Sequence, residues 1–147
     1  MNRFIALLLL AIPTTASAAD SSITEYQIPL CNLSPCIVEN DRGGVRQDYL
    51  ALAARMVRTR EQVKIKGGCL SACTILADQA RPFVCIYRGS TFSFHQATII
   101  DGKNTGKRFS VEYSRDIAAW LTAHGGQPTK GTLKMSYQDA RAFWPTC

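Results

Sequence analysis

The sequence predicts an α/β domain in which a mostly parallel sheet is flanked by helices and held by disulfide bonds. A strand-like apolar segment, a glycine-rich turn and a helix-like segment follow one another twice between residues 36 and 80. Right-handed crossovers convert that order into neighbouring parallel strands. Six cysteines also follow an N-terminal segment typical of export, which favours disulfides. The length suits a single domain, predicted over residues 19–147.

The first residues are organised as a secretory signal. A basic start over residues 1–3 precedes the apolar run Phe4–Pro13, which is shorter than the ~20 apolar residues of a membrane span. The small residues before Ala18 fit a cleavage site, so residues 1–18 are predicted to be removed, with cleavage after Ala19 as the second choice. An uncleaved anchor is the weaker alternative. The mature protein is expected in the periplasm or outside the cell, without a membrane span.

The first part of the predicted domain holds strands around one helix. Short strands are predicted at Tyr26–Pro29 and Cys36–Glu39, and the breaker cluster Asn40–Gly44 follows. Apolar residues recur on one helical face through Val45–Arg60, and Gln62–Ile65 alternates as a strand does.

The middle of the chain continues the same alternation. Gly67-Gly68 is predicted to end the preceding strand, and Ser71–Ala80 is small and apolar enough for a buried helix. Two further strands are predicted at Phe83–Tyr87 and Thr91–His95, and Ile99–Lys107 is predicted to be a loop.

The last third is predicted to be mainly helical. Val111–His124 has one apolar face, and Gly125-Gly126 stops it. His124 in its last turn suits a favourable charge at the helix C-terminus better than catalysis. Ser136 and Asp139 have the spacing of a capping box that opens a final short helix.

The cysteines are expected to form three disulfides. Cys31 and Cys36 flank a short turn and are predicted to pair. For the others, sequence alone does not choose among pairings, and we favour Cys73–Cys85 and Cys69–Cys147.

A zinc site is the rival interpretation of part of this set. Cys69, Cys73 and His95 could supply ligands, but their spacing is not that of a standard finger. An oxidising compartment also favours disulfides, so no metal is expected.

The formal net charge of +6 does not indicate a nucleic-acid partner. The basic residues are scattered, with no run of five or more like charges, and are best interpreted as a solvated surface. Affinity for anionic envelope polymers is compatible with this charge. Peptides or other envelope proteins are the expected partners.

Two glycine-containing turns carry the candidate chemistry. Residues 40–45 and 67–73 both join a strand to a helix, where backbone N–H groups are free to hold an oxyanion. Ser71 opens the second helix and, taken alone, is more often an N-cap. His95 ends a later strand and could remove the hydroxyl proton if the two residues meet.

In this order the motifs resemble the proteolytic subunit of the Clp protease and the periplasmic Clp/crotonase-like proteins of bacteria. The family's Asn-Ser-Pro-Gly-Gly is matched by Asn40–Gly44, with Asp-Arg in place of Ser-Pro, and its Gly-x-Ala-Ala-Ser by Gly67–Ser71. Its His-Gln-Pro is matched by His95-Gln96-Ala97, about two dozen residues later, and a later His-x-Gly-Gln by His124–Gln127. The resemblance covers about residues 36–140 and implies a Clp-protease/crotonase-like fold.

The resemblance also implies roles for individual residues. Ser71 corresponds to the nucleophile and His95 to the general base, and the backbone N–H groups of Gly44 and Ala72 would form the oxyanion hole. The family's long helical handle is shortened here, so a Clp-like double ring is not implied, although a homo-oligomer is compatible.

One member of the family's catalytic triad is missing. The position of its aspartate is occupied by Thr132, which cannot stabilise an imidazolium as a carboxylate does. Loss of that aspartate typically costs ~10⁴ in turnover, so peptidase activity is expected to be weak. Asp116 or Asp101 could substitute, but nothing in the spacing requires it.

The sequence therefore supports two leading functions. The first is a weak serine hydrolase or peptidase of the envelope that uses Ser71 and His95. The alternative is a catalytically degenerate relative that binds a peptide or another envelope protein. A thiol enzyme using Cys69 or Cys73 ranks last, because a disulfide sulfur is not a nucleophile. No cofactor is expected, coenzyme A included.

Overall fold

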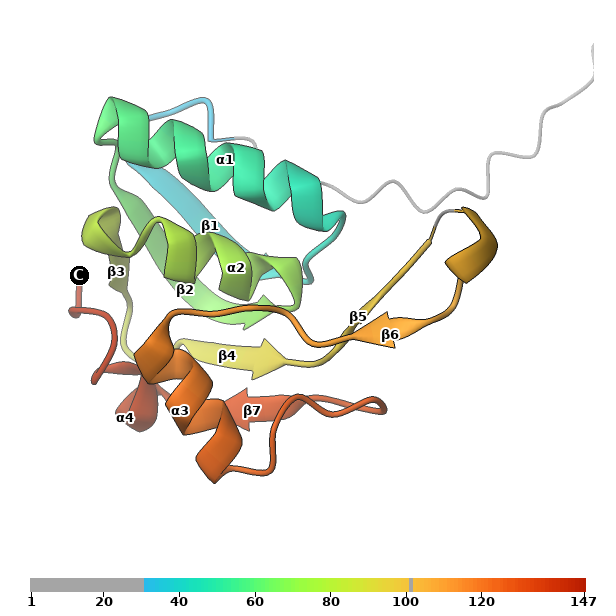
Figure 1. Ribbon diagram of the computed structural model, residues 1–147. Helices are drawn as coiled ribbons and strands as arrows, with labels where there is room; N and C mark the ends of the chain where they lie inside the picture. The colour runs from blue at the N-terminus through green and yellow to red at the C-terminus, as the bar shows by residue number, and fades with distance from the viewer. Residues whose placement is uncertain (1–30, 101) are drawn as a thin grey trace, which may run out of the picture.

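The computed structural model describes residues 31–100 and 102–147, which fold around a five-stranded sheet (Figure 1). Its strands are β1 (Cys36–Asp41), β2 (Val63–Leu70), β3 (Val84–Ile86), β4 (Thr91–Phe94) and β7 (Leu133–Met135). The order is β1-β2-β4-β7, with β3 also paired to β2; β1 to β4 run parallel and β7 runs antiparallel to β4. The predicted α/β class with a mostly parallel sheet is confirmed. The predicted signal peptide, the strand Tyr26–Pro29 and Asp101 lie outside the described residues.

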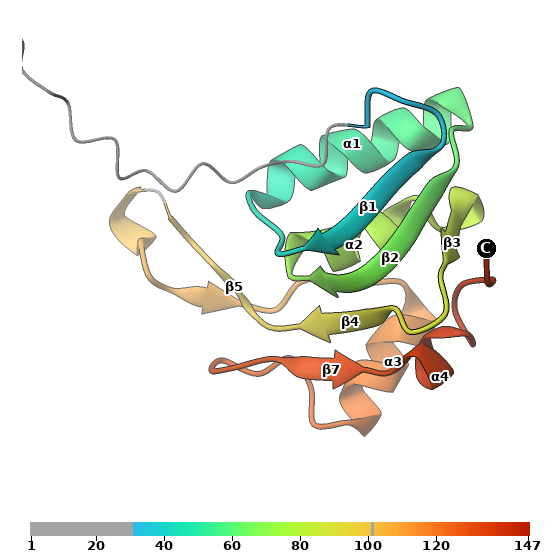
Figure 2. The ribbon, with the colours of Figure 1, turned by 180° about the vertical axis from the view of Figure 1, so that it is seen from behind.

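Helices cover one face of this sheet, and Figure 2 looks onto the other. The α-helices of the described residues are α1 (Arg46–Thr59), α2 (Ala72–Gln79), α3 (Arg115–Ala123) and α4 (Tyr137–Ala140), and η1 (Arg81–Phe83) is a 3-10 turn. The side chains of β4 alternate accordingly, because Phe92 and Phe94 are fully buried against the helices whereas Ser93 is half-buried. Since β1 and β2 are parallel, α1 and α2 both begin at the same edge of the sheet.

The sequence predicts that Gly67 and Gly68 end the strand, but in the structure they do not. Strand β2 runs through them to Leu70 because a side chain from β1 passes close by. The Gly68 N–H donates to Asn40 Oδ1 at 3.0 Å, and a Cβ on Gly67 would lie 2.2 Å from the same oxygen. The pair therefore serves a close approach at a bulge in β1, where the register shifts between Glu39 and Asp41.

The predicted loop at 99–107 belongs to a projecting hairpin. Strands β5 (Ala97–Thr98) and β6 (Arg108–Phe109) pair in antiparallel fashion and carry the 3-10 turn η2 (Gly102–Asn104) between them, away from the main sheet (Figure 1). We call residues 97–109 the arm. Its side chains include the exposed Ile100.

The other predicted helices are present, with one shorter than expected. The predictions for α1 and α2 agree with the structure within one residue, and Ser136 with Asp139 forms the expected capping box of α4. Helix α3 begins only at Arg115, because the extended residues before it are held by side chains: the Ser114 N–H donates to Asp78 at 2.8 Å. None of the helices among residues 31–100 and 102–147 has the length and apolar character needed to cross a membrane.

The disulfide pairing differs from the prediction for four of the six cysteines. Cys31–Cys36 is confirmed, but the other bonds are Cys69–Cys73 and Cys85–Cys147, in place of Cys73–Cys85 and Cys69–Cys147. The turn between β2 and α2 brings Cys69 and Cys73 to a Cα separation of 5.3 Å. The chain end lies beside β3, where the Cys147 N–H donates to Ile86 O at 3.0 Å and brings Cys147 to Cys85.

Candidate active site around Ser71

Ser71 occupies a strained position between the end of β2 and the start of α2. Its backbone angles are φ 57° and ψ −122°. Such a conformation costs on the order of 1–3 kcal/mol for a residue other than glycine and persists only where surrounding contacts enforce it. Ser71 is therefore not the relaxed N-cap that the sequence alone would favour, and its side chain makes no capping hydrogen bond.

Neighbouring groups hold this turn from both sides. The Ser71 N–H donates to Ser93 O at 3.0 Å, which ties the turn to β4. The Ser71 carbonyl accepts from both the N–H and the hydroxyl of Thr74, at 2.9 and 2.6 Å. The Thr74 hydroxyl also bonds the phenol of Tyr113 at 2.7 Å, and burial raises the pKa of Tyr113 to about 12, so this phenol stays protonated.

Gly43 is pressed against the same turn. It is buried with φ +80°, and a Cβ at this position would lie 2.5 Å from Leu70 O, 2.7 Å from Ser71 Cβ and 2.8 Å from Ala72 N. No side chain fits in that space. The two glycine-containing turns predicted from the sequence therefore meet.

Asp41 fixes the conformation of the Gly43 turn. Its Oδ1 atom accepts from the Gly43 N–H at 2.6 Å and from the Tyr49 hydroxyl at 2.8 Å. Tyr49 is fully buried, and this burial, together with the bond to Asp41, raises the pKa of the phenol well above its usual value. The phenol is therefore a permanent donor to Asp41.

Two backbone donors beside Ser71 are free. Within residues 31–100 and 102–147, the N–H groups of Gly44 and Ala72 donate to no acceptor. Gly44 follows the glycine that contacts Ser71, and Ala72 opens α2, where helix geometry leaves N–H groups unpaired. Both residues were predicted from the sequence to form an oxyanion hole, and their N–H groups are free to do so.

His95 directly follows β4, the strand that pairs with the end of β2. Leu70 pairs with Ser93 in the parallel register, so Ser71 follows β2 and His95 follows β4 at the same edge of the sheet. His95 is half-buried, and its Nδ1 atom bonds Gln96 O at 2.7 Å. Because a carbonyl only accepts, Nδ1 carries the proton and Nε2 keeps its lone pair.

No carboxylate among the described residues bonds His95. Thr132, which the resemblance assigns to the aspartate position, is exposed in the segment between Pro128 and Leu133. That segment lies opposite His95, because Phe94 pairs with Leu133 and the Gln96 N–H donates to Pro128 O at 3.0 Å. Thr132 carries no charge that could stabilise an imidazolium.

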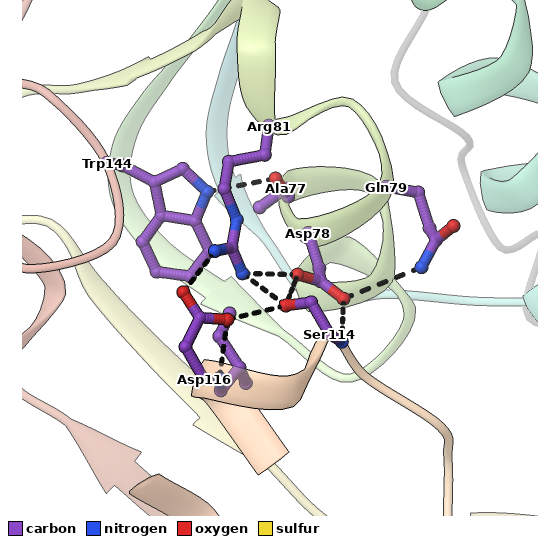
Figure 3. Close-up of polar contacts among 8 residues, drawn as sticks. Ala77, Asp78, Gln79, Arg81, Ser114, Asp116 and Trp144 are labelled. Carbon is purple, nitrogen blue, oxygen red and sulfur yellow. Dashed lines mark hydrogen bonds and ion pairs between the residues drawn. The ribbon is translucent and has the colours of Figure 1, made fainter. Parts of the chain in front are cut away.

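Asp116, the other candidate carboxylate, belongs to a different cluster (Figure 3). Its Oδ2 atom pairs with Arg81 at 2.5 Å, and Oδ1 lies 2.9 Å from the hydroxyl oxygen of Ser114. The hydrogen bond from Arg81 lowers the pKa of Asp116 to about 2. Asp116 is therefore committed to this ion pair and is not available to His95.

The same cluster contains the buried Asp78, which the sequence analysis missed. Its side chain has 0% exposure, and Oδ1 accepts from Arg81 at 2.6 Å and from the Ser114 hydroxyl at 2.5 Å. Arg81 also lies over the Trp144 ring, 5.8 Å from its centroid. The spacing of Asp78 and Arg81 at a helix end was the available signal. The cluster joins the end of α2 to the start of α3.

Neither the alternative zinc site nor the alternative thiol enzyme has free cysteines at positions 69 and 73. Cys69 and Cys73 are bonded to each other, so neither sulfur is a thiolate for zinc or for nucleophilic attack.

His124 is exposed at the C-terminus of α3, where it stacks on Trp120 and bonds the Trp120 carbonyl.

A shallow hollow lies at the far end of α1 and does not contribute to this site. It is lined mainly by the Cys31–Cys36 turn and by Arg55, Arg60 and Glu61. The rise of α1 separates it from the Gly43 turn by about 20 Å.

The sequence matches no protein-family model and no curated protein sequence. The geometry around Ser71 therefore carries the functional argument.

Proposed function

We propose that this protein is an exported serine hydrolase, with a peptide or another acyl compound as substrate, on a fold of the Clp-protease/crotonase type. The observation that carries the proposal is the backbone of Ser71, with φ 57° and ψ −122° at a strand-to-helix turn. Strained turns of this kind expose the serine hydroxyl in nucleophile elbows. A serine that served only to cap α2 would not need this conformation.

The neighbouring groups fit the remaining roles. Ser71 Oγ would attack the acyl carbon while His95 Nε2 takes its proton. The N–H groups of Gly44 and Ala72 would bind the oxyanion. Collapse of the resulting tetrahedral intermediate expels the leaving group, which receives the proton from His95. Water, deprotonated by His95, then attacks the acyl group and releases it from Ser71.

The Gln96 carbonyl replaces part of the role of a triad aspartate. It orients the imidazole and fixes the tautomer in which Nε2 can accept a proton. It carries no full charge, so it stabilises the imidazolium less than a carboxylate would. We therefore expect slow turnover, with His95 still required.

An oxidising compartment is part of the proposal. All six cysteines are paired in three disulfides, which persist in the periplasm or outside the cell. The N-terminal sequence supports the same location through its signal-like pattern.

A peptide- or protein-binding role is the competing proposal. It is supported by the arm, where Ile100 is 72% exposed and Phe109 is 39% exposed. Apolar side chains on a projecting hairpin are suited to a partner.

Labelling with a fluorophosphonate probe tests the hydrolase proposal. Ser71 Oγ would attack phosphorus and expel fluoride, and the purified, oxidised protein should be labelled once per chain. Ser71→Ala and His95→Ala should abolish or strongly reduce the labelling. His124→Ala is the matched control, because His124 is the only other histidine of the chain and lies away from Ser71.

The outcomes separate the two proposals. Labelling that is lost in both site variants but kept in His124→Ala supports the hydrolase. A folded, oxidised protein that is never labelled contradicts it. In that case, binding of envelope peptides that depends on Ile100 and Phe109 would support the competing role.

A further inference from the structure

The two cysteines of the Cys69–Cys73 disulfide are equally far from Ser71 in the sequence. The local sequence is Cys69-Leu70-Ser71-Ala72-Cys73, so the bonded residues lie two positions before and two positions after the serine. Nucleophile elbows of the Gly-x-Ser-x-Gly type have glycines at these two positions. Glycine is used where the backbone must turn sharply or approach closely.

The bond joins the strand before the turn to the helix after it, on the buried side. Cys69 belongs to β2 and is 1% exposed, and Cys73 belongs to α2 and is fully buried. The hydrogen bonds of the Ser71 backbone run instead to Ser93 and Thr74. The disulfide thus fixes the strand–helix angle covalently, whereas the hydrogen bonds fix only the peptide groups of Ser71.

The short separation of the two cysteines argues against a purely global role. A disulfide stabilises a fold mainly by restricting the unfolded chain, and it does so more for longer loops. Cys69 and Cys73 are separated by four positions, whereas Cys85 and Cys147 are separated by 62. The short bond is therefore the weaker one for overall stability, and its main effect is local.

We propose that Cys69 and Cys73 are positioning residues whose disulfide keeps Ser71 in its reactive conformation, in place of the glycines of other elbows. This inference rests on the proposed hydrolase function and adds to it a requirement for oxidation of one particular cysteine pair. Activity would thus depend on a bond that contacts neither substrate nor His95.

Paired variants test this role. Cys69→Ala/Cys73→Ala removes the short bond and leaves small apolar side chains, and we expect its fluorophosphonate labelling rate to fall at least tenfold. Cys85→Ala/Cys147→Ala is the matched control, with two cysteines removed away from Ser71. Its thermal midpoint should fall further than that of the first variant, while its labelling rate well below that midpoint stays within twofold of the wild type.

A structural measurement makes the result independent of activity. In a crystal structure of Cys69→Ala/Cys73→Ala, φ of residue 71 should leave the positive region. If the variant does not fold, Cys69→Ser/Cys73→Ser serves in its place.

The two proposals fail in different ways. A labelled wild type with an equally reactive, positive-φ Cys69→Ala/Cys73→Ala variant overturns the positioning role and leaves the hydrolase intact. An unlabelled wild type overturns the hydrolase and the positioning role with it. Equal loss of labelling in both cysteine variants, in step with their melting, would show a merely structural role.

Discussion

The two ends of α2 contrast in how their polar groups are satisfied. At the first end, Ser71 has a strained backbone and the N–H of Ala72 donates to no acceptor within the described residues. At the last end, both carboxylate oxygens of Asp78 are bonded, and its partners Arg81 and Ser114 are bonded to each other and to Asp116 (Figure 3).

The difference separates a turn with free donors and a strained backbone, as the proposed active site requires, from a cluster that stabilises the fold. Buried polar groups in a folded protein are normally paired, because an unpaired donor costs about 1–3 kcal/mol. A cluster that meets this rule, such as that of Asp78, has no capacity left for a ligand. The start of α2 keeps free donors and a strained backbone, as expected if the proposed substrate binds there.

Gly43→Ala should have the largest effect on the Ser71 end. The new Cβ would overlap Leu70 O and Ser71 Cβ, so the turn must move, and we expect a loss of about 3 to 4 kcal/mol in the free energy of unfolding. Labelling of the molecules that stay folded should fall roughly a hundredfold, because a shift of about 1 Å misaligns the nucleophile. Urea unfolding and probe labelling measure the two effects.

Gly126→Ala is a close control for that substitution. Gly126 has the same φ of +80°, but nothing lies within 4 Å of its would-be Cβ. Only the backbone cost of about 1 kcal/mol should appear, with labelling unchanged. Similar losses in both variants would mean that the contact with Ser71 is not significant.

Asp78→Ala should affect stability alone. It removes the buried partner of Arg81 and leaves the N–H of Ser114 without its acceptor, which should cost about 3 kcal/mol in urea unfolding. Labelling of Ser71 per folded molecule should not change, because the two ends of α2 are independent. A folded variant that has lost its labelling would contradict this separation.

Ser71→Gly should make the protein more stable while removing its reactivity. Glycine accepts a positive φ without the strain of serine, so we expect a gain of about 1 kcal/mol after its own entropic cost. Ser110→Gly, at an exposed position without a positive φ, should instead lose a few tenths of a kcal/mol. A destabilised Ser71→Gly variant would indicate that the turn is relaxed.

The smallest effect is expected in the acid response of Asp116. Its pKa is lowered to about 2 in the folded protein, so its stabilising contribution is complete above about pH 4 and is lost as the pH falls toward 2. Because the side chain is 52% exposed, the contribution should stay below about 1 kcal/mol. The difference in unfolding free energy between wild type and Asp116→Asn should shrink over this range, and a constant difference would refute the assignment.

Local patterns were sufficient to predict much of the fold. The apolar face of α1 and the capping pair Ser136 and Asp139 depend on residues within a few positions of one another. The strand–turn–helix order in turn fixes parallel pairing, as between β1 and β2. These features can therefore be predicted without any long-range contact.

Features set by distant contacts could not be obtained in the same way. Gly67 and Gly68 favour a break by composition, but Asn40 from another strand makes them part of β2. Likewise, Cys147 pairs with Cys85 because the chain end returns to β3, 62 positions away. Neither contact leaves a local signature.

The residues of the candidate site were proposed from the sequence, but the contacts that restrain them could not be. Ser71, His95 and the two glycine turns follow from motif order, and the structure brings the turns together. The Gln96 carbonyl on His95 is a backbone contact, which no residue type reveals. Asp78 was overlooked because its spacing to Arg81 was the only local signal, and its contact with Ser114 is long-range.

The order of the disulfides bears on how the chain would mature if the proposed export is correct. Each bond joins two cysteines that follow one another along the sequence, first Cys31–Cys36, then Cys69–Cys73, then Cys85–Cys147. In a chain that crosses a membrane N-terminus first and is oxidised as it emerges, the second cysteine of each pair would find its correct partner as the only other unpaired thiol. A thiol oxidase acting during translocation would produce the native set, and a disulfide isomerase would have no wrong pair to correct.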